Sequence, residues 1–133
     1  MKCPFNKIKV CWFLGMLLFL ISSCKKDTTA YTEIDAFADT QNKVVLDKGQ
    51  YILSFILAPY PYSKVEVYVH EDLSVMYKQT GGKVYDAVSQ SNYRYGVFFS
   101  PLEKNKKFYY QLIVYDSNGN TARSAIFNFT TQP

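Results

Sequence analysis

Cysteine, histidine and tryptophan are scarce in this chain, and most of them lie at its start. The 133 residues include three cysteines, one histidine and one tryptophan. The three cysteines and Trp12 all fall within the first 24 positions. Beyond Cys24 the sequence therefore offers no disulfide, no Cys/His metal cluster and no cysteine nucleophile. We expect the rest of the chain to be held by its hydrophobic core alone.

The motifs of the common enzyme classes are also missing. The sequence has no Gly-rich phosphate loop and no Gly-x-Ser-x-Gly elbow. The single histidine, His70, precedes Glu71 and Asp72, but neighbouring strand residues point to opposite faces, so the three side chains do not converge. We interpret His70 as a solvated strand residue. The chain is predicted to be no enzyme and to hold no cofactor.

One stretch of the chain also has to be considered as a calcium-binding loop. Residues 116–120 (Asp-Ser-Asn-Gly-Asn) resemble the opening of an EF-hand loop. However, Gly119 stands at the fourth position instead of the sixth, and Phe127 occupies the twelfth position, where a glutamate is needed. We therefore interpret this stretch as a turn and predict no metal site.

The positive charge of the chain belongs mostly to its first residues. The formal net charge is +4, from 15 basic and 11 acidic residues. Lys2, Lys7 and Lys9 precede an apolar run at residues 10–21. Without these three lysines the charges nearly balance, and no basic block is left, so we expect no nucleic-acid partner.

Residues 1–23 are typical of a secretory signal peptide. A lysine-containing start leads into an apolar run of about a dozen residues, whereas a membrane-spanning helix needs about 20. Small residues then follow. We expect this segment to be removed and to form no part of the fold.

The end of that segment, Ile21, Ser22, Ser23 and Cys24, resembles a bacterial lipobox. The resemblance implies that Cys24 becomes the mature N-terminus and carries several acyl chains, which hold a protein to a membrane far better than one chain does. The alternatives are an ordinary signal peptide with a chance cysteine, or an N-terminal membrane anchor. Lys25 after the cysteine resembles the pattern for delivery to the outer membrane, and Cys-Lys followed by Asp27 resembles surface lipoproteins of the Bacteroidetes. The side of the membrane stays open.

The rest of the chain reads as β-strands in a single domain. All 12 tyrosines lie beyond residue 23, and tyrosine and β-branched residues favour strands. We expect a tether at residues 24–30, or extending to 42, and a domain at residues 31–133. The first strand is either 31–37, anchored by Ile34 and Phe37, or 43–46. Further strands are predicted at 51–57, 64–70, 73–78, 83–88, 93–99 and 108–115, with turns or loops at 47–50, 58–63 and 89–92, and with no helix.

Residues 107–131 read as a hairpin. Asn118-Gly119 predicts a two-residue type I′ turn, in which Ser117 pairs with Asn120. This register places Phe108 opposite Phe129 and Tyr110 opposite Phe127. Further along, it pairs Leu112 with Ala125, Tyr109 with Asn128, Gln111 with Ile126 and Ile113 with Ser124. In the strand at 64–70, Val65, Val67 and Val69 point inward while Glu66, Tyr68 and His70 point outward.

About seven strands at ten-residue spacing predict an antiparallel β-sandwich. The last 35 residues, from Pro101-Leu102 through the hairpin, resemble the end of a fibronectin type III domain. This resemblance implies an immunoglobulin-like fold. The corner tyrosine of that family falls on Phe108, which has no hydroxyl, so either Tyr109 or Tyr110 replaces it or the domain is a looser immunoglobulin-like relative.

Tyr60 and Tyr62 are the candidate binding residues, because rigid amphipathic rings on a proline-stiffened loop suit recognition. Asn118 and Asn120 lie on a loop at the same end of such a sandwich. The alternative is that these tyrosines fold back and close that end. An exposed edge strand is a second candidate surface.

We predict a lipid-anchored, non-catalytic accessory subunit of a bacterial envelope that engages another envelope protein. The membrane contact is made through the N-terminal lipid. The alternatives are a glycan-binding surface lipoprotein of a polysaccharide-utilisation system and a structural spacer.

Overall fold

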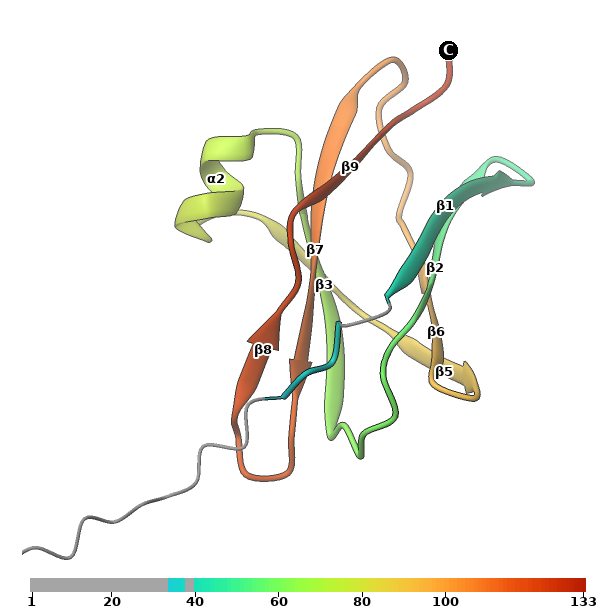
Figure 1. Ribbon diagram of the computed structural model, residues 1–133. Coiled ribbons are helices and arrows are strands. Elements are labelled where there is room, and N and C mark those ends of the chain that lie inside the picture. The colour runs from blue at the N-terminus through green and yellow to red at the C-terminus, as the bar shows by residue number, and fades with distance from the viewer. Residues whose placement is uncertain (1–33, 38–39) are drawn as a thin grey trace, which may run out of the picture. The chain divides into compact units, whose positions relative to one another are not determined.

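The computed structural model describes residues 34–37 and 40–133, which form two antiparallel sheets and a short helix (Figure 1). The elements are β1 Gln41–Asp47, β2 Gln50–Ile56, β3 Lys64–His70, α2 Leu73–Lys78, β4 Lys83–Asp86, β5 Val88–Ser91, β6 Arg94–Phe98, β7 Lys107–Tyr115, β8 Thr121–Arg123 and β9 Phe127–Thr130. The expected all-β class is confirmed. This part of the chain holds nine strands, two more than the seven or so predicted. No helix in it is long and apolar enough to cross a membrane. The signal peptide, lipobox and Cys24 lie outside the described residues.

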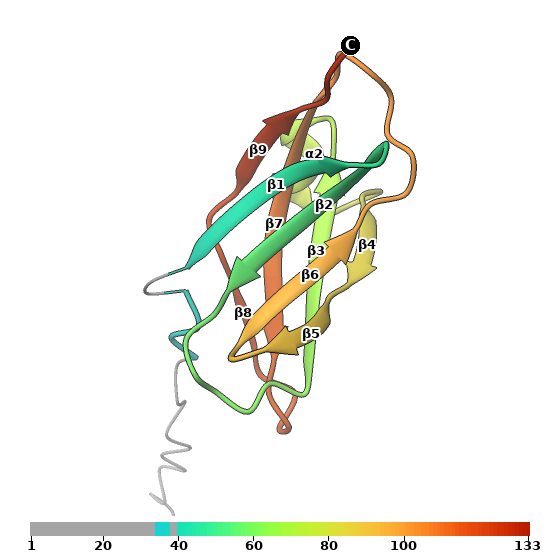
Figure 2. The ribbon, with the colours of Figure 1, turned by 90° about the vertical axis from the view of Figure 1, so that its right-hand side faces the viewer.

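The two sheets face each other across one core. The first sheet has the order β1-β2-β6-β5; in the second, β4, β3 and β7 are neighbours, and both β8 and β9 pair with β7 (Figure 2). Every pairing is antiparallel. The most deeply buried core side chains come from both sheets, namely Leu53, Phe55, Val97 and Phe99 from the first and Val67, Leu112 and Val114 from the second. The predicted inward face of β3, with Val65, Val67 and Val69, is confirmed.

The first strand in the described residues is β1, which contains residues 43–46. Residues 34–37 form no strand. They are nevertheless fixed to the domain, because Ile34 is only 6% exposed, Ala36 is fully buried, and the Ala36 carbonyl accepts a hydrogen bond from the Ala58 N–H at 3.0 Å. The chain therefore enters the domain beside the loop at residues 58–63.

The strand predicted at 73–78 is wrong, and so is the prediction that there is no helix. These residues form α2, which the Asp72 side chain caps by accepting from the Ser74 N–H at 2.7 Å. The helix ends at Gln79, which has a left-handed φ of 54°. Met76 packs on Tyr68 from β3. Tyr68 does point away from the main core as predicted, but the helix buries it.

The chain changes sheets at Ala87, where we predicted a single strand at 83–88. β4 pairs with β3, whereas β5 pairs with β6 in the other sheet. The loop predicted at 89–92 is also wrong, because Val88–Ser91 is strand. The hairpin turn is Asn92-Tyr93, whose φ values are 47° and 59°. Two successive positive φ values are the signature of a type I′ turn.

The final hairpin follows its predicted register only in part. Phe108 pairs with Phe129, Tyr109 with Asn128 and Tyr110 with Phe127, as predicted. Nearer the turn the prediction is wrong, because Ile113 pairs with Arg123 instead of Ser124. The register shifts by one residue between β8 and β9. Two further predicted pairs, Gln111 with Ile126 and Leu112 with Ala125, are therefore not strand pairs in this sheet.

The cause of this shift is the turn. The Gly119 N–H donates to the Asp116 carbonyl at 3.2 Å, and the Asp116 N–H donates to Asn120 at 3.0 Å. In this loop only Gly119 has a positive φ, of 82°. These features describe a three-residue loop with glycine in the left-handed position, not the predicted two-residue turn. The turn predicted at 47–50 is confirmed, and the structure shows that its two central residues, Lys48 and Gly49, both have positive φ.

Candidate binding sites

The described domain has two ends that differ in what they offer a partner. We call the end with residues 34–36 and the loops 58–63 and 116–120 the entry end, because the chain joins the domain there (Figure 1). The opposite end, formed by the loop at 99–106 together with the last residues of β3 and the first residues of β4 and β7, is called the far end. The four residues predicted to bind, Tyr60, Tyr62, Asn118 and Asn120, all lie at the entry end.

Tyr60 and Tyr62 are packed against the core and against each other. Their ring centroids are 5.3 Å apart, and the Tyr62 ring meets Tyr95 edge-on at 6.4 Å. The Tyr62 hydroxyl donates to the Ala58 carbonyl at 2.7 Å. Burial, together with the nearby Tyr95 hydroxyl, raises the pKa of Tyr62 to about 12. These tyrosines therefore fold back and close the entry end of the sandwich, which was the alternative to their role as binding residues.

Asp116 organises the neighbouring loop. Its carboxylate accepts from the Asn118 and Asn120 N–H groups at 2.8 and 2.9 Å and from the Asn120 side-chain amide at 2.8 Å. The Tyr60 hydroxyl lies 3.5 Å from the same carboxylate. These hydrogen bonds, the one from the Asn120 side chain first, lower the pKa of Asp116. Asn120 and Tyr60 thus have an internal partner, and the Asn118 side chain is the most available of the four.

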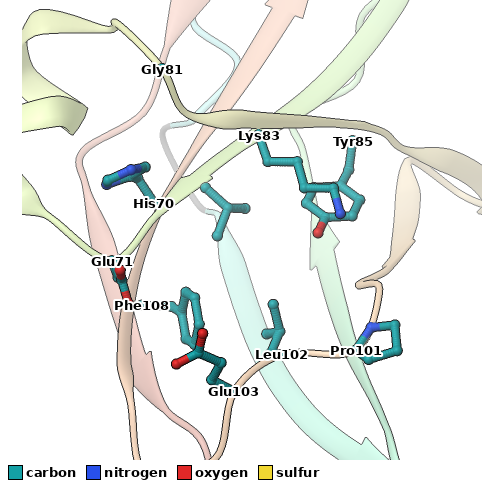
Figure 3. Close-up of a pocket in the computed structure, with 10 residues that line it drawn as sticks. His70, Glu71, Gly81, Lys83, Tyr85, Pro101, Leu102, Glu103 and Phe108 are labelled. Carbon is teal, nitrogen blue, oxygen red and sulfur yellow. The ribbon is translucent and has the colours of Figure 1, made fainter.

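A pocket of about 290 Å³ opens at the far end (Figure 3). Its apolar part is formed by Val69 from β3, Tyr85 from β4, Phe108 from β7, and Pro101 and Leu102 from the preceding loop. Its volume is near the lower end of the ~300–1,000 Å³ typical of ligand pockets. The pocket is therefore sized for one bulky side chain or one small ring.

Carboxylates lie on one side of this pocket. Glu71 and Glu103 both contact Lys106, whose ammonium nitrogen is 3.0 Å from each carboxylate. These two hydrogen bonds, the one to Glu71 first, raise the pKa of Lys106. The Lys106 backbone is tied to the last strand, since its N–H donates to the Thr131 hydroxyl at 2.9 Å and that hydroxyl donates to the Glu103 carbonyl at 2.7 Å. The loop is thereby held in one position.

A cation lies on the other side. Figure 3 shows Lys83 and Tyr85 across the pocket from Glu71 and Glu103. The Lys83 ammonium sits 5.1 Å from the centre of the Tyr85 ring and donates to the Ser100 hydroxyl. Ser100 also shares a 2.8 Å hydrogen bond with the Tyr85 hydroxyl. The pocket thus has an apolar floor between an acidic side and a basic side.

His70 lines the same pocket at the end of β3. Its Nδ1 accepts from the Asp72 N–H at 2.8 Å, which leaves Nε2 as the protonated nitrogen of the neutral ring. Among residues 34–37 and 40–133, no three His, Cys, Asp or Glu side chains are placed to hold a metal ion. The pocket residues offer a ligand apolar contact, hydrogen bonds and charge.

The sequence did not predict this pocket, because its residues come from four separate segments. His70 and Glu71 were judged not to converge on one site, Phe108 was placed only as a strand residue, and Lys83 and Glu103 were not singled out. One signal was present. In an antiparallel sheet, the end of one strand lies beside the start of the next. The end of β3 is therefore expected beside the start of β4, whereas its position beside the start of β7 is known only from the structure.

The chain matches no protein-family model, and no curated protein shows a significant sequence match to it.

Proposed function

We propose that this protein is a lipid-anchored, non-catalytic binding subunit of a bacterial envelope, held by Cys24 and built on an immunoglobulin-like domain related to fibronectin type III. The lipobox-like Ile21-Ser22-Ser23-Cys24 supports the anchor, and Lys25 supports the outer membrane. Two facing antiparallel sheets support the fold. The Tyr110 hydroxyl, two residues after Phe108, donates to the Asn42 side chain of β1 at 2.6 Å and joins the two sheets, which differs from the local backbone bond of that family's corner tyrosine.

The single observation that carries the binding role is the position of the far-end pocket. Residues 34–36 join the core at the entry end. A chain lipidated at Cys24 therefore holds that end within about 35 Å of the bilayer, the reach of ten extended residues. The pocket lies at the far end of the domain, opposite to residues 34–36.

A protein segment is the ligand that fits the pocket best. An apolar side chain can enter beside Phe108 and Leu102, while flanking charges of either sign meet Lys83 or Glu103. A glycan is less well matched. Sugar binding relies on open aromatic faces, whereas the Lys83 ammonium lies over the Tyr85 ring and the Tyr60 and Tyr62 rings pack on each other.

The test is a crosslinked pull-down of the tagged full-length protein from its native envelope. We expect a near-stoichiometric protein partner, which is lost from a Cys24→Ala variant because the anchor is gone. Lys83→Glu, in the pocket, should lower the recovery of that partner. Lys104→Glu makes the same charge change on an exposed residue that belongs to the 99–106 loop but does not itself line the pocket, and should leave the recovery unchanged.

Two outcomes would contradict the proposal. No partner above background would remove the protein-binding role and direct the full-length protein to a polysaccharide binding screen. Equal recovery with the Lys83→Glu and Lys104→Glu variants would place the partner elsewhere on the molecule.

A further inference from the structure

Strand β1 is the one long, regular edge of the two sheets in the part of the chain that the structure describes. It spans seven residues and pairs with β2 on one side only. The other edge strands, β4, β5, β8 and β9, have three or four residues each, and β5 contains a register shift. Short strands and bulges are common ways to protect an edge from pairing with another chain, and β1 has neither.

The backbone of β1 presents regular hydrogen-bonding groups to this open side. The Phe99 N–H donates to the Tyr51 carbonyl at 3.0 Å, so the backbone of Tyr51 faces β6. Successive residues of an antiparallel strand turn their N–H and C=O groups to opposite neighbours. Ile52 therefore faces β1, and its partner Val45 faces β2. It follows that the N–H and C=O groups of Val44 and Leu46 face the open edge.

Apolar side chains surround these backbone groups. Val45 is 37% exposed and Leu46 is 41% exposed. On the outer face of the sheet, Val45 lies beside Ile52, which in turn lies beside Phe98, and Phe98 is 51% exposed. These three residues form an apolar row that runs across the sheet and stops at the open edge.

We propose that this edge pairs with the β1 strand of a second copy of the chain, antiparallel, with Val45 at the two-fold axis. Two copies of Val45 then lie side by side, and the apolar row continues from Phe98 of one copy to Phe98 of the other. Leu46 of each copy is covered by Val44 of the other. The inference goes beyond the proposed binding role and uses residues that do not line the far-end pocket.

Charge complementarity selects this partner and this register. With Val45 on the axis, Lys43 of each copy lies opposite Asp47 of the other, as a close pair on the outer face. No ion pair among residues 34–37 and 40–133 involves Lys43 or Asp47. A pairing centred on Val44 would instead place Lys43 opposite Val45 and Asn42 opposite Leu46. Opposite charges in facing positions stabilise a strand pair, and such mismatches do not.

The lipid anchor permits this arrangement. In the proposed pairing, the Gln41 residues of the two copies are about 27 Å apart, eight residues at ~3.3 Å each. Because the paired strands are antiparallel, both anchors reach one membrane when the strand pair lies along its surface, where the ten residues from Cys24 to Ile34 cover up to ~35 Å.

The first test is disulfide crosslinking of the full-length protein in a bacterial envelope. Facing residues at the axis have Cα atoms about 4.5 Å apart, within the range that a disulfide spans. The Val45→Cys variant should therefore form a dimer that reduction dissolves. Two controls should form no such dimer. One is the unaltered chain, which keeps Cys24, and the other is a Val88→Cys variant, whose cysteine is exposed on the opposite edge strand β5.

Charge exchange provides the second test, in the Val45→Cys background. Lys43→Glu places a glutamate opposite Asp47 of the other copy in both facing pairs. This repulsion should lower the dimer fraction about tenfold under limiting oxidation. Adding Asp47→Lys restores opposite charges and should restore the dimer. The proposal is overturned if Val45→Cys forms no more dimer than Val88→Cys, if Val44→Cys crosslinks in its place, or if the double exchange fails to restore crosslinking.

Discussion

Two tyrosine hydroxyls, one buried and one half-buried, contribute to the response of this domain to alkali. Tyr110 is 2% exposed and donates to Asn42, and Tyr62 is packed at the entry end. Burial raises the pKa of each to about 12. A tyrosine in an unfolded chain ionises near pH 10. Between these values the unfolded chain releases protons that the folded domain keeps, so the free energy of unfolding falls as the pH rises from about 10 to about 12.

We therefore expect the urea midpoint of the full-length protein to drop steadily from pH 10 towards pH 12. Tyr110→Phe together with Tyr62→Phe should make that decline shallower, because neither ring can then ionise. Urea unfolding curves at pH 8, 10 and 11 measure it. Tyr77→Phe, whose ring is 73% exposed on α2, is the control and should keep the original slope. An unchanged slope in the double variant would show that other groups cause the alkaline loss.

At the scale of elements, α2 stabilises the second sheet by covering its outer face. The helix has only six residues, too few to be stable alone in water, so it depends on its tertiary contacts. Met76 is its buried residue, at 1% exposure, and packs with Tyr68 and Ile113. The next residue, Tyr77, points to solvent.

Met76→Ala should lower the free energy of unfolding by about 2–4 kcal/mol, because it leaves a cavity between the helix and the sheet. Tyr77→Ala, in the same helix, should change it by less than about 0.5 kcal/mol. Urea denaturation followed by circular dichroism compares the two. Similar losses for both variants would mean that helix propensity, and not packing on Tyr68, holds α2 in place.

At the scale of the whole molecule, no disulfide joins the two sheets, since no cysteine follows Cys24, and core packing is their main link beside hydrogen bonds such as that from Tyr110 to Asn42. Phe99 is central to this packing. It follows β6, is fully buried, stacks on Phe129 at 5.6 Å and meets Tyr85 edge-on at 5.2 Å. Its neighbour Phe98 points to the outer face.

Phe99→Ala should therefore destabilise the domain by about 3–5 kcal/mol, a large part of the ~5–15 kcal/mol typical of a domain. Phe98→Ala removes an equal side chain from the outer face and should cost less than about 1 kcal/mol. Thermal and urea unfolding of the full-length variants measure both. Equal losses would contradict the assignment of the core to the inner faces.

The sequence by itself determined the all-β class, most of the strands and the pairing of Phe108 with Phe129, because alternating apolar residues specify which face of a strand is buried. The lipobox-like pattern that ends at Cys24 was also recognised from the sequence alone, and it stays a prediction. Tertiary structure decided the rest. α2 forms where Met76 meets Tyr68, and the strand at 83–88 divides at Ala87 because its two halves pair with different sheets. The far-end pocket exists only once four distant segments are brought together. A local sequence pattern indicates which side chains are buried, but it does not indicate which distant residues cover them.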